Sequence, residues 1–224
     1  MEEKKFVQFK KDELEMKDFV KVSFGKGKIS NVSVEYTPVG EKIIVSTNKP
    51  GIVIGRRGER IEELTAVLKK RFKLENPHIE ISEITKAEFD AQLVADDIAL
   101  ALERLGSLKF KVVAYKMLQR IMGAGALGVE LVLSGKLPSE RAKTWRFAQG
   151  FLKKIGNSAK IVSRAEARAD TMMGTIGIKV AILPADAIIE DQIDVNESLL
   201  NKIKLNKLRT NDDSKNNQRN KKHE

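Results

Sequence analysis

The residues best suited to bind a charged ligand are Gly55, Arg56, Arg57 and Gly58, which form the tetrapeptide GRRG. Glycine adopts backbone conformations that let the main chain come close to a ligand. Arginine stays cationic and presents a planar fork of donors that matches phosphate. These residue types at this spacing are suited to clamp a sugar-phosphate chain. We therefore expect the four residues, together with Arg60 just after them, to contact RNA.

The residues before the tetrapeptide predict two paired strands. Val32, Val34 and Tyr36 alternate with polar residues, which is the period of a half-buried strand. A turn at residues 39–40 leads into a second β-rich run over residues 42–47. We expect these two runs to form an antiparallel pair.

A helix is expected on each side of the tetrapeptide. Asn48 can cap a short helix with Pro50 in its first turn, where a missing amide donor costs little, and Gly55 ends that helix. After Gly58 one stripe of an amphipathic helix is formed by Ile61, Leu64, Leu68 and Phe72. This second helix is expected to end near residues 76–77.

A third strand then follows, because Ile79 and Ile81 alternate with polar residues. The expected order is strand, strand, helix, GRRG, helix, strand, which is a KH-like arrangement. An ordinary turn between two helices is the alternative explanation for GRRG, since glycines end helices and arginines are common on surfaces. The position of the loop, directly before a helix N-terminus, favours RNA contact.

Changes of pattern predict three segments along the chain. An N-terminal helix over residues 12–24 carries the apolar residues Leu14, Phe19, Val20 and Phe24. Thr85 and Glu88 form a capping box for a helix that runs to Gly106. We place an RNA-binding domain in residues 1–105, a second small α+β domain in 106–190 and a basic tail without fixed structure in 191–224.

A further helix is expected over residues 108–122. Val112, Val113, Met117 and Ile121 lie on one side of it, and Lys109, Lys116 and Arg120 share another face. Gly123, Gly125 and Gly128 follow and match the G-x-G-x-x-G pattern of dinucleotide-binding folds. That pattern requires a strand before it and a helix after it, whereas the order here is the reverse. We expect no cofactor and assign the glycines to a turn.

Basic and aromatic residues alternate after the next strand. Arg141 and Lys143 share their parity with Trp145 and Phe147, whereas Arg146 has the opposite parity. A surface of this kind can hold phosphate and stack on bases. A core position is the preferred interpretation for Trp145, and phosphate contact is preferred for Arg141 and Lys143.

Composition is consistent with a nucleic-acid binder. The chain has 224 residues, a formal net charge of +10 and a pI near 9.6, which attracts nucleic acid or an acidic membrane surface. It contains no cysteine and only two histidines, His78 and His223, so no metal site is expected. No apolar run is long enough to span a bilayer. We expect a soluble intracellular protein that is not associated with a membrane.

Three runs of sequence resemble one family. They are GRRGERIEELTAVLKKRF at 55–72, SGKLPSERAK at 134–143 and GTIGIKV at 174–180. In this order and spacing they are similar to the small-subunit ribosomal protein S-three family in its archaeal and eukaryotic form, over about residues 5–184. The resemblance implies a type II KH domain followed by a second α+β domain, both in the head of the small ribosomal subunit.

The resemblance also implies partners and site residues. Members bind small-subunit rRNA, contact neighbouring head proteins and help to line the passage by which mRNA enters; they are not obligate enzymes, and no homo-oligomer is implied. GRRG corresponds to the KH clamp loop. Lys116 and Arg120 lie on the helix that resembles the family's mRNA-channel helix, and the basic strand-turn segment is matched by Lys136, Arg141 and Lys143.

The sequence departs from the family pattern at two places. Pro138 and Ser139 replace a basic residue and glycine, which stiffens that turn and removes a cation. Val112 and Val113 stand where some members have arginine, so we expect passive guidance of mRNA rather than strand separation.

A free-standing KH regulator is the alternative function. A nuclease using Asp90, Asp96 and Asp97 is disfavoured, because adjacent carboxylates on a helix point about 100° apart.

Overall fold

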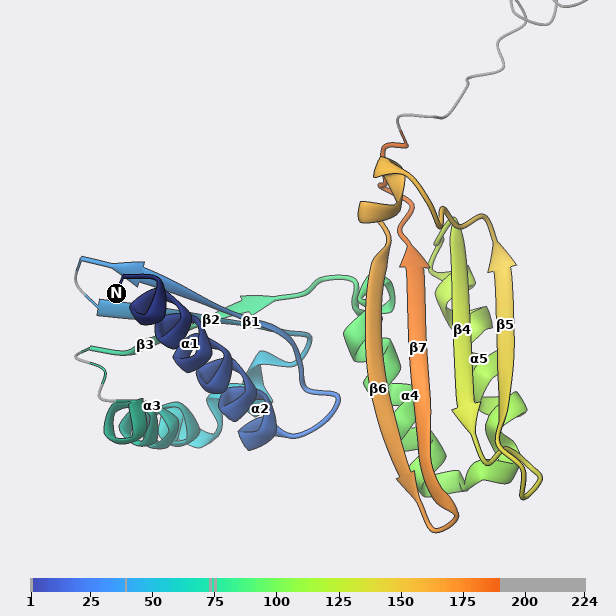
Figure 1. The fold of residues 1–224 in the computed structure, drawn as a ribbon, viewed down its shortest axis with the longest axis horizontal. Helices are drawn as coiled ribbons and strands as arrows, with labels where there is room; N and C mark the ends of the chain where they lie inside the picture. Colours follow the sequence, from blue (N-terminus) through green and yellow to red (C-terminus); the bar gives the residue numbers. More distant parts are fainter. Residues whose placement is uncertain (1, 39, 73, 75, 190–224) are drawn as a thin grey trace, which may run out of the picture. The chain divides into compact units, whose positions relative to one another are not determined.

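The first of two sheets has three strands in the order β1-β2-β3, as expected from the alternating apolar residues (Figure 1). The structure, a computed structural model, describes residues 2–189 except 39, 73 and 75. β2 pairs antiparallel with β1 and parallel with β3. The strands are β1 (Ile29–Thr37), β2 (Gly40–Thr47) and β3 (His78–Glu83).

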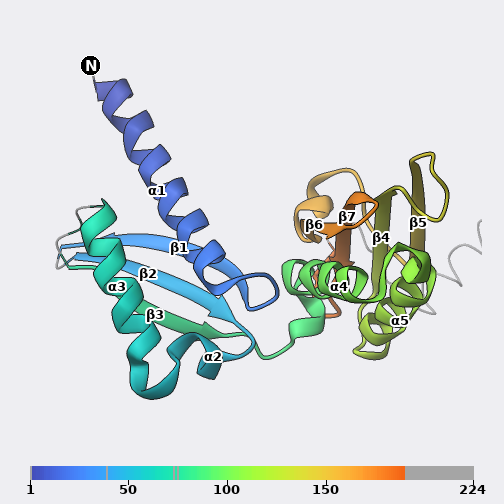
Figure 2. The same cartoon turned by 90° about the horizontal axis from the view of Figure 1, so that it is seen from below.

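Three helices accompany this sheet and complete its core (Figures 1 and 2). They are α1 (Glu2–Phe24), α2 (Pro50–Ile54) and α3 (Glu59–Phe72). Buried side chains of both sheet and helices form one cluster, including Val20, Ile43, Val45, Val53 and Leu68. Strands β1–β3 with these helices are called the first module.

Several local expectations for the first module were wrong. The N-terminal helix begins ten residues earlier than expected, and Leu14 is 60% exposed instead of packed on the sheet. Lys49 rather than Asn48 precedes α2, and no side chain caps that helix, although Pro50 does occupy the first turn. α3 already ends at Phe72. Local sequence signals predicted which elements form but not the residues at which they begin and end.

The second sheet has four antiparallel strands in the order β5-β4-β7-β6. The strands are β4 (Gly128–Gly135), β5 (Lys143–Gly150), β6 (Ser163–Thr171) and β7 (Gly174–Leu183). Helices α4 (Ala91–Leu105) and α5 (Phe110–Gly123) pack on one face of it (Figure 2). These elements are called the second module, and their buried side chains form a separate core.

The inner and outer faces of this sheet differ sharply. Leu131, Leu133, Ile178 and Val180 alternate inward against the helices and are buried. The strand positions between them point to the outer face. At the edge strand β5, Phe147 is buried and Trp145 is partly buried against the same core. This confirms the preferred core position of Trp145.

The α4–α5 region departs from the sequence expectations. Asp90 caps α4 by accepting a hydrogen bond from the Gln92 amide at 2.9 Å, so Thr85 is not the cap. Val112 is 67% exposed, whereas its neighbour Val113 is buried. The reason is geometric, because consecutive helical residues point about 100° apart and cannot share one face.

Helix α4 bears on where the two domains meet. The boundary expected from the sequence, after Leu105, places this helix in the first domain. Its buried residues instead belong to the core of the second module. We therefore infer that the boundary lies between β3 and α4.

The expected tail, residues 191–224, lies outside the described residues. Within the described part of the chain, no helix is long and apolar enough to cross a membrane.

Contacts join the α1–β1 loop of the first module to α4 within the compact unit of residues 1–187. The Gly27 amide donates to Asp96 Oδ2 at 2.9 Å, and Lys26 Nζ lies 2.8 Å from Glu103 Oε1. Ser30 Oγ donates to Asp90 Oδ2. Two of the three carboxylates that a nuclease would need are therefore used in structural hydrogen bonds.

Candidate nucleic-acid interface

The GRRG loop joins α2 to α3 through a short 3-10 turn, Arg56–Gly58. The Gly55 amide donates to the Gly51 carbonyl at 3.1 Å and so closes α2. Gly55 and Gly58 have φ values of 76° and 85°, which glycine adopts without strain. Arg57 has φ 54° and is the non-glycine residue with positive φ in the described part of the chain. The loop therefore holds an arginine in a conformation that costs backbone energy.

The cations of this loop have different surroundings. Arg56 and Arg57 are exposed, and neither has an ion pair among the residues that the structure describes. Arg60 is also exposed, but its Nη1 donates to the Ile52 carbonyl at 3.1 Å. A Cβ at Gly55 would lie 3.0 Å from the Arg60 side chain. Arg60 thus braces the loop, and Arg56 and Arg57 are the two charges left for a ligand.

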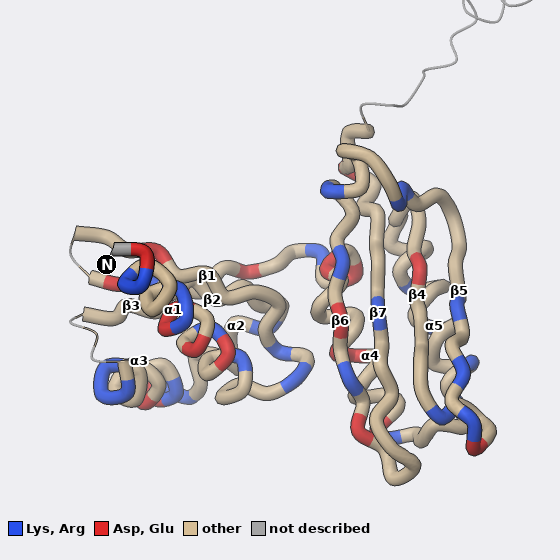
Figure 3. The backbone as a smooth tube through the Cα atoms, viewed as in Figure 1, with Lys and Arg blue, Asp and Glu red and all other residues tan. Residues whose placement is uncertain are grey.

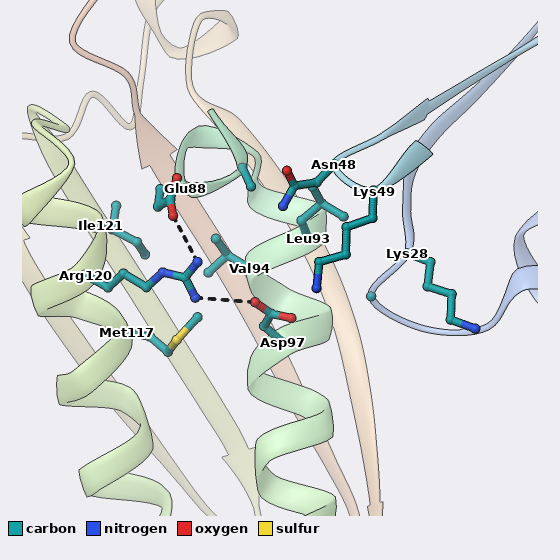
Figure 4. Close-up of a pocket in the computed structure, with 12 residues that line it drawn as sticks. Lys28, Asn48, Lys49, Glu88, Leu93, Val94, Asp97, Met117, Arg120 and Ile121 are labelled. Atoms are coloured by element: carbon teal, nitrogen blue, oxygen red, sulfur yellow. Dashed lines mark hydrogen bonds and ion pairs between the residues drawn. The ribbon is translucent and has the colours of Figure 1, made fainter. Parts of the chain in front are cut away.

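The three cations expected on the α5 helix do not form one free surface. Lys109 lies in the 3-10 turn before α5, and both it and Lys116 are exposed. Arg120 instead reaches back to the start of the second module, where Nη2 lies 2.9 Å from Glu88 Oε1 and Nη1 lies 3.8 Å from Asp97 Oδ2 (Figure 4). A hydrogen bond from Arg120 keeps the pKa of Glu88 below its usual range.

Arg120 and its two partners line a small pocket (Figure 4). Lys28 and Lys49 line the same pocket from loops of the first module, together with the apolar side chains of Met117 and Ile121. The carboxylates of Glu88 and Asp97 offset the cations around it. Both carboxylates pair with Arg120, so this cation is engaged within the protein and is poorly placed to bind a polyanion.

The basic strand-turn segment is also divided by the structure. Lys136 and Arg141 lie exposed in the β4–β5 connection, and Leu137 between them is fully buried and anchors the loop. Lys143 begins β5 and is exposed. Arg146 points to the opposite face, where its Nε pairs with the carboxylate of Glu130. Arg146 therefore lies on the opposite face of β5 from Lys143, and Lys136 and Arg141 lie in the connection outside the sheet.

Several cations that belong to no sequence motif were not predicted as candidate binding residues. Lys111 Nζ lies 4.6 Å from the Trp145 ring centroid, and the ring of Trp145 is 5.5 Å from that of Phe110. Lys154, Arg164 and Lys179 gather around a hollow on the outer face of the second sheet. No short sequence pattern marks these residues, because strand register brings them together.

Two family models match the chain. One is described as "KH domain" and matches residues 15–89. The other is described as "Ribosomal protein S3, C-terminal domain" and matches residues 98–182. The residues between the matches fall at the beginning of α4. The matches confirm a KH domain followed by a second α+β domain.

Curated relatives are similar along most of the chain, and each carries the name "Small ribosomal subunit protein uS3". That of Methanocaldococcus jannaschii is 40% identical over 198 residues, which is 88% of this chain and 94% of that protein. That of Archaeoglobus fulgidus is 38% identical and covers 87% of this chain and 84% of its own length. That of Methanococcus maripaludis is 34% identical, with 87% and 92% covered. The two matching family models and this extent of similarity show that the chain belongs to the uS3 family of small ribosomal subunit proteins.

Proposed function

We propose that this protein is a structural constituent of the small ribosomal subunit head that binds small-subunit rRNA. The relatives are named as small ribosomal subunit proteins, and the chain carries a net charge of +10. The observation that carries the proposal is the pair Arg56 and Arg57, exposed between two glycines of positive φ at the start of α3. The cell compartment that follows from this role is the cytoplasm, where ribosomes work.

The proposed mechanism is placement of charge and involves no bond chemistry. Arg56 and Arg57 form charge-assisted hydrogen bonds with phosphates and release the counterions condensed on RNA. The buried core of the first module, with Val53 before the loop and Leu68 after it, keeps the loop in place. The protein then acts as a spacer that holds rRNA segments and neighbouring head proteins in position, as one copy per subunit.

A finer part of the proposal concerns mRNA. Lys109 and Lys116 are exposed and are available to attract the incoming strand, whereas Arg120 is engaged by Glu88. Val112 is exposed at a position where a cation would strengthen strand contact. This distribution supports passive electrostatic guidance of mRNA, with weak strand separation.

The clamp loop is tested by reversing its charge. Arg56→Asp with Arg57→Asp is expected to weaken binding to a small-subunit rRNA transcript and to lower the log-log salt slope by about 1.4, or about 0.7 per single-strand phosphate. Aspartate tolerates the left-handed conformation of residue 57 better than most residues. Lys69→Asp with Lys70→Asp makes the same charge change at exposed positions near the end of α3 and serves as the control. Equal slopes for both double variants would refute the clamp assignment.

The ribosomal role is tested separately by sedimentation. The tagged protein is expected to travel with small subunits through a sucrose gradient after a high-salt wash. A free-standing KH regulator of messenger RNA would instead be released by the wash. Loss of the wild-type protein from washed particles would overturn the structural role.

A further inference from the structure

The outer face of the second sheet is a charged surface on which no helix of the described residues packs (Figure 2). Three rows of residues cross its four strands, as the strand register shows. In the order β5, β4, β7, β6 the rows are Ala148, Glu130, Ala181 and Arg164; Arg146, Val132, Lys179 and Glu166; and Thr144, Ser134, Gly177 and Arg168. These twelve residues, with Lys154 from the β5–β6 connection, are called the outer sheet face.

Cations outnumber carboxylates on the outer sheet face. Its five cations are spread over three of the strands and the connection, as the basic positions on β5, β6 and β7 show in Figure 3; they are Arg146, Lys154, Arg164, Arg168 and Lys179. Its two carboxylates belong to Glu130 and Glu166, and Glu166 Oε1 lies 2.8 Å from Lys179 Nζ. Five minus two leaves a net charge of +3. Asp170, next along β6, lies 3.8 Å from Lys26 Nζ of the first module, which Glu103 approaches more closely at 2.8 Å.

Glu130 organises the centre of this charge. Its side chain is only 14% exposed, and it pairs with Arg146 and, at 3.0 Å, with Lys154 Nζ. Arg164 Nη2 donates to the Lys154 carbonyl at 3.4 Å and so joins the β5–β6 connection to β6. The cations are therefore held in fixed positions before any ligand arrives. Such preorganisation lowers the entropy lost on binding.

The composition of the outer sheet face decides what kind of partner fits. A protein interface needs a desolvated centre with aromatic or large aliphatic anchors. The three rows contain no aromatic side chain, and Val132 is their largest apolar residue. Nucleic-acid interfaces are instead polar and strongly positive. Without aromatic residues the surface lacks the usual platform for stacking bases, which favours contact with the sugar-phosphate backbone.

We propose that the outer sheet face is a second rRNA-binding surface, which holds backbone phosphates independently of the GRRG loop. Gly177, Ser134 and Ala181 have small side chains, so the sugar-phosphate backbone of RNA can approach the sheet beside the cations. Arg164 and Arg168, which are exposed and have no ion pair among the described residues, contact the phosphates, and Glu130 is a positioning residue. This inference rests on the proposed rRNA-binding function and names a second place where it operates.

Neutralising the surface tests the inference. Arg164→Gln and Arg168→Gln together are expected to weaken binding to a small-subunit rRNA transcript and to lower the log-log salt slope by about 1.4 to 1.8, at about 0.7 to 0.9 per phosphate contact. The control combines Lys69→Gln and Lys70→Gln, which remove the same charge from exposed positions of the first module. The control is expected to lower the slope far less. A sheet variant with the wild-type slope overturns the inference.

A measurement on the wild-type protein guards against misfolding of the variant. Lys154 and Lys179 are expected to be protected from acetylation when the rRNA transcript is bound, whereas Lys69 and Lys70 stay reactive. Equal modification of Lys154 and Lys179 with and without RNA overturns the inference.

The remaining outcomes separate this inference from the proposed function. If the sheet variant binds RNA normally but is lost from subunits, the face contacts a protein, and the inference is wrong. If the clamp-loop variant loses RNA and the sheet variant does not, the inference alone falls. If the wild-type protein neither binds the transcript nor sediments with subunits, the proposed function itself falls.

Discussion

The guanidinium of Arg120 lies 2.9 Å from the carboxylate of Glu88, a residue 32 positions earlier in the chain. This pair joins α5 to the 3-10 turn before α4, and Asp97 of α4 adds a longer contact at 3.8 Å. Arg120 is thus a structural cation, although its spacing from Lys109 and Lys116 suggested a common RNA-binding face. Three residues of one charge therefore have different surroundings, since Lys109 and Lys116 are exposed.

Replacing Arg120 and Lys116 in turn tests this difference. Arg120→Met is expected to lower the free energy of unfolding by about 1 kcal/mol or less, because the pair is half exposed, and to leave the salt slope of RNA binding almost unchanged. Lys116→Met is expected to leave stability unchanged and to reduce the slope. Urea unfolding and filter binding measure the two effects. The reverse pattern would show that Arg120 leaves Glu88 to bind RNA.

The strained backbone of Arg57 predicts a difference between two neutral replacements. A non-glycine residue in the left-handed region costs about 1 kcal/mol. Arg57→Gly is therefore expected to be more stable than Arg57→Ala by about that amount, while both lose the same cation and the same part of the salt slope. Urea denaturation of the two variants provides the comparison. Equal stabilities would mean that residue 57 does not hold its φ of 54° in solution.

The glycines that imitate a dinucleotide-binding pattern predict opposite effects of alanine. A Cβ at Gly128 would overlap the backbone of Phe151, whereas one at Gly123 meets no atom within 4 Å. Gly128→Ala is expected to destabilise the second module by about 1–3 kcal/mol. Gly123→Ala, at the end of α5, is expected to be neutral or slightly stabilising. Thermal melting distinguishes them, and a harmless Gly128→Ala would contradict the close strand approach.

The buried carboxyl group of Asp96 is expected to make the stability of the protein depend on pH, with a defined sign. Burial raises the pKa of Asp96 above its ordinary value, although hydrogen bonds from Gly27 and Gln92 oppose the shift. Because the folded pKa is above the unfolded one, the stabilising contribution is complete below the unfolded pKa, near pH 4, and is lost as pH rises through the folded pKa. Lys26 and Asp97 are the charged groups that act on it.

Asp96→Asn serves as the reference for this effect, since it keeps an acceptor oxygen and cannot ionise. The unfolding free energy of the wild type minus that of the variant is expected to fall as pH increases from about 4 and then to level off. Urea titrations at a series of pH values give this difference. A difference that grows with pH would mean that the folded protein prefers the charged carboxylate.

Much of the first module could be predicted because its signals are local. Alternating residues such as Val32 and Val34 mark a strand, and the stripe of Ile61, Leu64 and Leu68 marks a helix, whatever the rest of the chain does. The caps were less predictable. Asn48 and Thr85 are good capping residues, yet Lys49 and Asp90 occupy those positions, because tertiary packing decides where a helix begins.

The sequence by itself determined the order of the elements, the GRRG loop between two helices and the family resemblance, since all of these depend on neighbouring residues or short motifs. Only the tertiary structure decided which cations are free. Arg56 and Arg57 remain unpaired in the described part of the chain, whereas Glu88 engages Arg120 and Glu130 engages Arg146. Ion pairing depends on distance in space, and strand register and helix packing set that distance between residues far apart in the sequence.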